Sequence, residues 1–297
     1  MGTSSMYGGP NRSPLLPSDF NDGDSNIDNP NSPKIPELRP DENLPDGEKE
    51  PHKKDPTEAS LEKEPSSNNP QYSTWSQAKK SMSRYASGNA GRNGKTKAIS
   101  DYVKGYGGSR NAAKSAKSAI KTTINIGDFF GGVSKKGISQ VLKDYQIPIE
   151  GRTPKEILND IVNILAPTPD LNDDSVARKA LVNTMSIIYE KFDDEKKEIS
   201  LLDSLDPDVT KMLITKYIEI FIYERLIHDV GSRIEKKAEN SSAAAKIEKD
   251  LKEYIETKVS TTLKDKPLSL VNSQTKNVNT LVEELYQQCY KVLEDQL

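Results

Sequence analysis

The amino-terminal end is the part of this sequence whose residue types are best suited to chemistry. Removal of Met1 would expose the amine of Gly2, and glycine is the least hindered residue at that position. An α-amine has a pKa of about 7.7–8.0, against about 10.4 for a lysine side chain, so more of it is uncharged and nucleophilic at neutral pH. We therefore expect Gly2 to be a good acceptor for acyl transfer.

Two other outcomes are weighed for this end of the chain. N-myristoylation follows the pattern M-G-x-x-x-[ST], and the sixth residue here is Met6, so the pattern fails. An N-terminus that carries no modification stays open as the second outcome.

The sequence offers little for metal or covalent catalysis. Its two histidines, His52 and His228, are far apart, and no cysteine stands at zinc-ligand spacing from either. The single cysteine, Cys289, falls on the apolar stripe of the last expected helix, which predicts a buried thiol rather than a nucleophile. We expect no metal site, no cofactor and no catalytic residue.

Two glycine-containing segments are candidates for anion binding. Residues 88–96 read G-N-A-G-R-N-G-K-T, but a phosphate loop would need glycine where Asn89 stands, so we interpret them as a loop between helices. The second segment consists of Gly107, Gly108, Ser109, Arg110 and Asn111. Its glycines lead into a helix N-terminus beside an arginine, which suits an anion or an acidic partner. A simple glycine break with Ser109 as N-cap is the alternative.

Charge is distributed unevenly along the chain. Residues 1–70 carry seven basic and fourteen acidic residues, a net charge of −7, whereas residues 71–122 carry eleven basic residues and one acid, a net charge of +10. This basic block is either a solvated face or a surface that meets an acidic protein, the acidic segment of this chain, or nucleic acid. Its exposed cations would include Lys114, Lys117 and Lys121, on the outer face of an alanine-rich helix.

The aromatic residues of the basic block bear on the choice between these partners. Trp75 and Tyr85 lie on one face of a first helix, and Tyr102 and Tyr106 on one face of a second. This spacing is typical of a helical core, so it favours packing over stacking on nucleic-acid bases. A nucleic-acid-binding module centred on residues 71–122 is nevertheless kept as the alternative function.

The apolar periodicity predicts an all-α fold, an irregular multi-helix domain in one piece or two lobes. We expect helices at about 74–87, 95–106, 109–121, 138–145, 154–165, 174–191, 207–237, 243–259 and 274–293. The strongest start signal is Thr153 to Glu156, a capping box with proline at the first helical position. The β-branched segment 122–126 is the one strand candidate. Residues 127–132, where glycines enclose Phe129 and Phe130, are assigned to no helix.

The composition predicts four regions. Residues 1–14 form an exposed head motif, 15–70 a disordered tether rich in proline, asparagine and acids, 71–148 a basic Gly- and Ala-rich helical lobe, and 149–297 a helical bundle lobe. The tether has too few apolar residues to offset the entropy lost on ordering.

The same composition predicts a cytoplasmic protein without a membrane partner. One cysteine excludes an intramolecular disulfide and fits a reducing compartment. The most apolar stretch, 209–230, is interrupted by charged residues, and the first residues lack the pattern of a secretory signal.

Several motifs, taken in order, resemble the QatB family of the bacterial Qat anti-phage defence system. They are G-T-S-S-M-Y-G-G-P at 2–10, S-P-L-L-P at 13–17, W-S-Q-A-K at 75–79, Tyr85, and Y-V-K-G-Y-G-G-S-R-N-A-A at 102–113. The resemblance covers the head and roughly residues 72–146; the later helices match only in being helical and variable. It implies a non-enzymatic scaffold or adaptor in antiviral defence, with an ATPase, a QueC-like enzyme and a TatD-like nuclease as partners.

The resemblance also implies a role for the head. In systems of this type the QueC-like enzyme joins a 7-deazaguanine carboxylate to a protein N-terminus, so Gly2 would be the modified residue. Thr3, Ser4 and Ser5 would lie in the cleft of that enzyme, and Tyr7, Gly8, Gly9 and Pro10 would fix the register.

Overall fold

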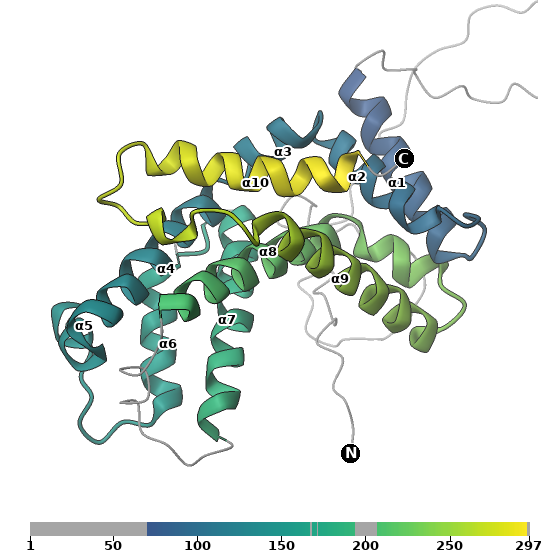
Figure 1. Cartoon of the computed structure of the whole chain (residues 1–297). Coiled ribbons are helices and arrows are strands. Elements are labelled where there is room, and N and C mark those ends of the chain that lie inside the picture. Colours follow the sequence, from purple (N-terminus) through teal and green to yellow (C-terminus); the bar gives the residue numbers. More distant parts are fainter. Residues whose placement is uncertain (1–69, 167, 171, 194–206, 296–297) are drawn as a thin grey trace, which may run out of the picture. The chain divides into compact units, whose positions relative to one another are not determined.

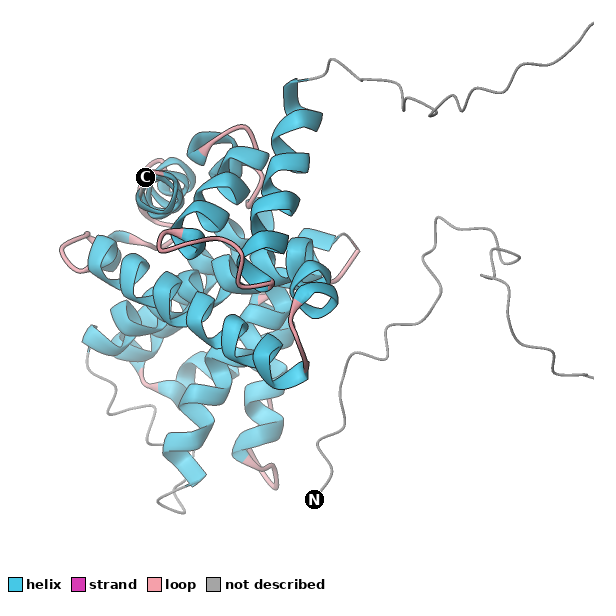
Figure 2. Ribbon diagram, turned by 90° about the vertical axis from the view of Figure 1, so that its right-hand side faces the viewer, coloured by secondary structure: helices cyan, strands magenta, loops and turns pink. Residues whose placement is uncertain are grey.

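The computed structural model describes residues 70–166, 168–170, 172–193 and 207–295, and every regular element in these ranges is a helix (Figures 1 and 2). The predicted all-α fold is thereby confirmed. The head motif and the tether, predicted to be disordered, lie outside the described residues except for Pro70, which begins the first helix.

The described elements follow one another along the chain without a strand between them. They are α1 (Pro70–Ala86), α2 (Gly94–Gly105), α3 (Ser109–Lys114), α4 (Lys117–Lys136), α5 (Ile138–Asp144), α6 (Pro154–Leu165), α7 (Asn172–Asp193), α8 (Pro207–Lys237), α9 (Ser241–Leu263), the 3-10 turn η2 (Leu268–Leu270) and α10 (Val278–Glu294).

Helix α8 is the central element of the core. Its side chains Leu213, Tyr217 and Phe221 are fully buried. Helices α1, α4, α7 and α9 all pack against it, and Figure 1 shows α9 alongside it. The broad apolar face of this segment predicts such a position, because a helix that is apolar over most of its circumference must be covered on most sides.

Helix α6 starts as its sequence predicts. The Thr153 hydroxyl accepts a hydrogen bond from the Glu156 amide at 3.3 Å, and the Glu156 carboxylate accepts one from the Thr153 amide at 2.8 Å. Pro154 occupies the first helical position, where its missing N–H costs nothing. This reciprocal capping satisfies two of the amides that a helix start leaves without partners.

The strand candidate at 122–126 is wrong, and so is the absence of a helix at 127–132, because α4 runs through both. Thr123 fits a helix interior by donating its hydroxyl to the Ala119 carbonyl at 2.8 Å. Gly127 is required by packing: a Cβ there would lie 1.6 Å from the Val271 carbonyl oxygen. Burial between neighbouring helices outweighs the β propensity of the threonines and isoleucines.

One carboxylate joins three elements at the edge of the bundle. Asp250 of α9 accepts a hydrogen bond from the Tyr85 hydroxyl of α1 and an ion pair from Lys95 of α2 at 2.6 Å. Both donors lie more than 150 residues before it in the chain.

The described helices share one continuous core, which extends across the predicted boundary at residues 148–149. Helix α10 packs on α2, α3 and α4, and α8 packs on α1 and α4. Buried residues on both sides of the boundary belong to a single cluster. A division into two lobes stays a prediction.

Candidate functional site

The predicted anion-binding segment forms a tight turn between α2 and α3, which we call the α3 turn (Gly107, Gly108 and Ser109). Gly107 and Gly108 have φ angles of +85° and +94°, values that favour glycine. The Ser109 amide donates to the Glu294 carboxylate at 3.0 Å. The place that an anion would take at this turn is therefore the place of the chain's own Glu294 side chain.

The alternative prediction, Ser109 as the N-cap of α3, is wrong by one residue. The N-cap is Gly108, and Ser109 is the first residue of α3. A Cβ on Gly108 would lie 3.1 Å from the nearer Glu294 carboxylate oxygen. Glycine is needed here both for the backbone angle and for the approach of that carboxylate.

The aromatic residues beside the turn pack on one another. Trp75 contacts Tyr102 and Tyr106 edge to face, with ring centroids 5.9 and 5.0 Å away. A Cβ on Gly105 would lie 3.1 Å from the Trp75 ring, so glycine lets α2 approach α1. The structure thus places these rings in packing contacts, as their helical spacing predicts.

Two of these tyrosines converge on one carboxylate of α8. The hydroxyls of Tyr102 and Tyr106 donate to the same oxygen of Asp229, at 3.0 and 2.5 Å. Burial is the main reason that the pKa of each tyrosine lies well above its usual value, and the Asp229 charge raises it further. Both hydroxyls therefore stay protonated and remain donors at neutral pH.

Arg225, one turn earlier on α8, fixes the far end of α3. It is 7% exposed and donates to the Ala112 carbonyl at 3.1 Å and to the Ser115 hydroxyl at 2.9 Å. Its guanidinium lies 4.3 Å from the centroid of the Tyr106 ring, a cation–π contact. A cation at the last carbonyls of a helix also matches the helix dipole.

The other predicted contact residues remain on the surface. We call Arg110, Lys114, Lys117 and Lys121 the cationic face; all four are exposed, and none has an ion pair within the part of the chain that the structure describes. Asn111 is exposed as well but serves the turn, because its amide donates to the Gly107 carbonyl at 3.2 Å.

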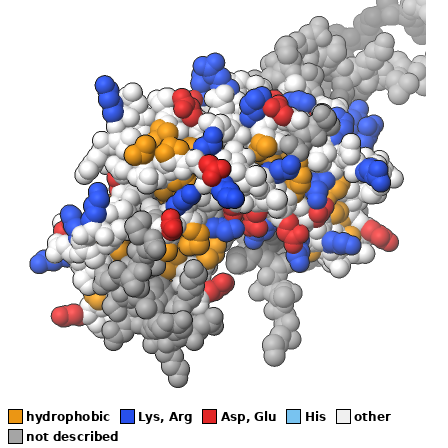
Figure 3. Space-filling model, in the orientation of Figure 1, with side chains coloured by type: hydrophobic (Ala, Val, Ile, Leu, Met, Phe, Trp, Pro, Cys, Tyr) orange, Lys and Arg blue, Asp and Glu red, His pale blue; other side chains and the backbone are white. Residues whose placement is uncertain are grey.

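Most other basic residues of the block 71–122 are likewise exposed and without an ion pair to a described residue. Lys95 and Lys97 are half-buried and pair with Asp250 and Asp101. The nine other basic residues of 71–122 are exposed, with no ion pair to a described residue. In Figure 3, Lys and Arg side chains lie along the upper edge and the right-hand side of the visible face, with acidic side chains between them.

The cysteine and the described histidine, which were considered for metal or covalent chemistry, have different surroundings. Cys289 is buried in α10, and burial raises the pKa of its thiol well above the usual value, which confirms the predicted buried thiol. His228 is exposed and lies 3.1 Å from Asp229. Among the described residues, no three His, Cys, Asp or Glu side chains cluster as metal ligands. His52 and the head residues Gly2, Thr3, Ser4, Ser5, Tyr7, Gly8, Gly9 and Pro10 lie outside the described residues.

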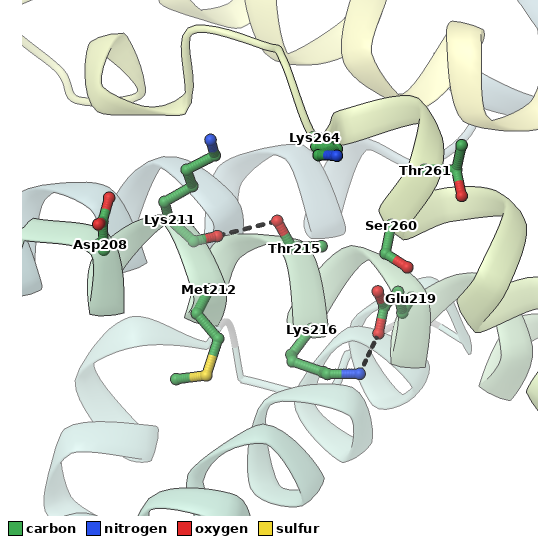
Figure 4. Close-up of a pocket in the computed structure, with 9 residues that line it drawn as sticks. All are labelled: Asp208, Lys211, Met212, Thr215, Lys216, Glu219, Ser260, Thr261 and Lys264. Carbon is green, nitrogen blue, oxygen red and sulfur yellow. Dashed lines mark hydrogen bonds and ion pairs between the residues drawn. The ribbon is translucent and has the colours of Figure 1, made fainter.

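Two hollows were not foreseen from the sequence. One of about 670 Å³ lies between α4, α5 and the η2 segment. The other, about 590 Å³, lies between α8 and α9 and contains the buried Glu219 (Figure 4). The sequence did contain a signal for the second hollow. Glu219 is an acid in the middle of the most apolar stretch, three residues after Lys216.

A family model described as "Qat anti-phage system associated protein QatB" matches residues 107–293, more than half of the chain. The chain belongs to the QatB family. Membership makes it a component of the Qat anti-phage system, with its partners in that system. The QatB match begins at the α3 turn and includes Arg225, Asp229 and the pocket between α8 and α9. No curated protein and no solved structure matches the chain.

None of the described helices is both long enough and apolar enough to cross a lipid bilayer.

Proposed function

We propose that this QatB-family protein acts as a non-enzymatic, cytoplasmic scaffold of its defence system and that its N-terminal glycine is the acceptor in a conjugation reaction. The QueC-like enzyme of the system would activate a 7-deazaguanine carboxylate and pass the acyl group to the Gly2 amine. An amide bond forms, the amine loses a proton, and the activating group leaves.

The head sequence is the observation that carries this proposal. Gly2 offers an unhindered α-amine with a pKa near neutrality, and Thr3 to Ser5 are small enough to enter an enzyme cleft. Tyr7 to Pro10 would set the register.

Contacts of the helical body support the scaffold role. The α3 turn is held at one end by Glu294 and α3 at the other by Arg225. Arg110 and Lys114 of the cationic face therefore stand on a firmly positioned short helix, and Lys117 and Lys121 stand on the first turns of α4. Exposed charges on a rigid support suit the docking of an acidic protein surface, because the backbone that carries them need not be ordered on binding. The ATPase and the TatD-like nuclease are the proposed docking partners.

The test is the intact mass of the protein from cells that carry the whole system. We expect loss of Met1 and a deazaguanine-sized adduct on the N-terminal peptide, absent when the QueC-like enzyme is inactivated. Gly2→Pro should abolish the adduct, because its secondary amine is hindered, and should leave the circular dichroism unchanged. Gly23→Ala, a glycine outside the head motif, is the matched control and should still be modified. An unmodified N-terminus in the complete system would refute the conjugation.

Nucleic-acid binding is the second candidate, favoured by the nine exposed cations without ion pairs to described residues. Binding to duplex DNA should weaken as salt rises, and replacing Lys114, Lys117 and Lys121 by glutamine should lower the slope of log K against log salt by up to about 3. The same change at Lys236, Lys249 and Lys252 is the control. Absence of binding at low salt would remove this candidate.

A further inference from the structure

The basic block 71–122 has an excess of positive charge at its surface and no exposed acid of its own. Its single acid, Asp101, is buried and pairs with Lys97 at 3.0 Å. Nine of its cations are exposed, without an ion pair to a described residue. Residues 123–297 differ, because they carry 24 basic and 30 acidic residues, a net charge of −6. An acidic segment is therefore attracted to the basic block and not to the helices that follow it.

The cationic face places part of this charge in close pairs. Arg110 and Lys114 stand four residues apart on α3, and Lys117 and Lys121 stand four residues apart on α4. Side chains four residues apart on a helix are neighbours, with Cβ atoms about 5–6 Å from each other. Like charges this close repel each other, so an anion beside either pair is stabilising.

The negative charge of residues 1–70 is concentrated in the part that is nearest to α1 along the chain. Residues 41–64, which we call the proximal acidic segment, carry nine acidic and four basic residues, a net charge of −5. Residues 1–40 carry five acidic and three basic residues, a net charge of −2. The segment that best complements the cationic face is therefore the one that directly precedes the helical body in sequence.

Helix α1 begins close to the α3 turn. Trp75, in the second turn of α1, contacts Tyr106 with 5.0 Å between the ring centroids. Tyr106 directly precedes the α3 turn, and Arg110 directly follows it. Glu64 is six residues before the start of α1, and six residues reach at most about 20 Å. The chain is therefore long enough for the proximal acidic segment to reach the cationic face.

We propose that the proximal acidic segment binds the cationic face of its own chain and competes there with acidic partners. This inference rests on the proposed docking function of the cationic face and adds its regulation. Covalent linkage gives the segment an effective concentration of about a millimolar, so even a weak contact is populated. Weakly bound polyanions are then excluded, whereas a partner surface of higher complementarity displaces the segment.

Paramagnetic broadening of amide signals in the full chain tests the contact without any partner. A spin label on Asn43→Cys marks the proximal acidic segment, because the native Cys289 is buried and inaccessible to the reagent. At about 50 mM salt the signals of the cationic face should lose most of their intensity, and at about 1 M salt, where the Debye length is about 3 Å, they should recover. The signal of Lys249 on α9 should not change. Full intensity of the cationic face at low salt would overturn the proposal.

A charge-neutralised variant separates attraction from tethering. Replacing the five acids of residues 41–50 by their amides should abolish the broadening, and the same change of the five acids of residues 19–37 is the matched control and should preserve it. The two sets are Asp41, Glu42, Asp46, Glu48 and Glu50, and Asp19, Asp22, Asp24, Asp28 and Glu37. Broadening that persists in the first variant would reflect the tether alone and would overturn the proposal.

A mixture of two chains separates the intramolecular contact from one between copies. When one chain carries the spin label and only the other carries the isotope that is detected, the signals of the cationic face should keep their intensity. Broadening in this mixture would assign the contact to a second copy and would overturn the proposal.

Binding of a polyglutamate peptide measures the competition. The variant neutralised at 41–50 should bind the peptide about threefold or more tightly than the parent, because the intramolecular competitor is removed. The variant neutralised at 19–37 should bind it as the parent does. Equal affinity of all three chains would refute the competition. Failure of the ATPase and the nuclease to bind a chain that shows the broadening would refute the proposed docking function alone.

Discussion

Arg225 and Glu219 lie on the same helix, less than two turns apart, and both are nearly inaccessible to solvent. The arginine receives its partners from the chain itself, through Ala112, Ser115 and the ring of Tyr106. The glutamate is paired with Lys216, and the Ser260 side chain nearby also opposes the rise in its pKa. A buried charge that several distant residues hold serves the fold, whereas we expect a buried charge whose ion-pair partner is partly exposed to contribute much less to it.

The largest effect should follow from removing the satisfied charge. Arg225→Met would leave the Ala112 carbonyl and the Ser115 hydroxyl without their donor, and we expect a loss of about 3 kcal/mol in the free energy of unfolding. The midpoint of urea unfolding measures it. Lys114→Met, an exposed change on the adjoining α3, should stay within about 0.5 kcal/mol. An unchanged midpoint for Arg225→Met would break the comparison.

The α3 turn should come next. Gly108→Ala would place a side chain at φ +94° and ψ 172°, a region open almost only to glycine, and within 3.1 Å of the Glu294 carboxylate. We expect a loss of about 2 kcal/mol. Gly88→Ala provides the control, because φ there is also positive but nothing lies within 4 Å of the new Cβ. The excess cost of Gly108→Ala over the control combines the stricter backbone angles at Gly108 with the approach of Glu294. Equal costs for the two variants would contradict both.

Removing the Glu219 charge should have a much smaller effect. Glu219→Met deletes the buried carboxylate together with the Lys216 pair, and the Lys216 side chain, 36% exposed, can reach water. These changes oppose each other, so we expect stability within about 1 kcal/mol of the parent. A loss of stability as large as that of Arg225→Met would mean that Glu219 contributes as much to the fold as Arg225 does.

The smallest effect is a pH dependence. Because the folded-state pKa of Glu219 is raised, mainly by burial, the folded state holds its proton more tightly than the unfolded state. The contribution of Glu219 is fully present below the unfolded pKa of about 4.3 and is lost as pH rises through the folded pKa. The stability of the parent relative to Glu219→Gln should therefore fall over this window in urea titrations at stepped pH. A constant difference would contradict the raised pKa.

Local signals in the sequence were sufficient for much of the fold. The capping box at Thr153, the broad apolar face of α8 and the apolar stripe that holds Cys289 are each set by neighbours in the chain. The segment 122–126 was misassigned because the burial that makes it helical comes from other helices. Its companion Gly127 is explained only by Val271, about 140 residues later.

The candidate sites depended even more on distant contacts. The α3 turn was identified from its glycines, but its partner Glu294 lies 185 residues further on. Glu219 was overlooked because an isolated acid in an apolar helix does not reveal what will surround it. That follows only when α9 is placed beside α8.

The Asp250 contacts have a mechanical consequence. Helix α1 is the first described element after the head and tether, so any tension on the preceding chain would reach the body through α1. Because Tyr85 of α1 and Lys95 of α2 both hold the same carboxylate of α9, that tension would be shared with a helix far along the chain instead of peeling α1 away alone. Force spectroscopy on Asp250→Ala should then show α1 detaching at a lower load.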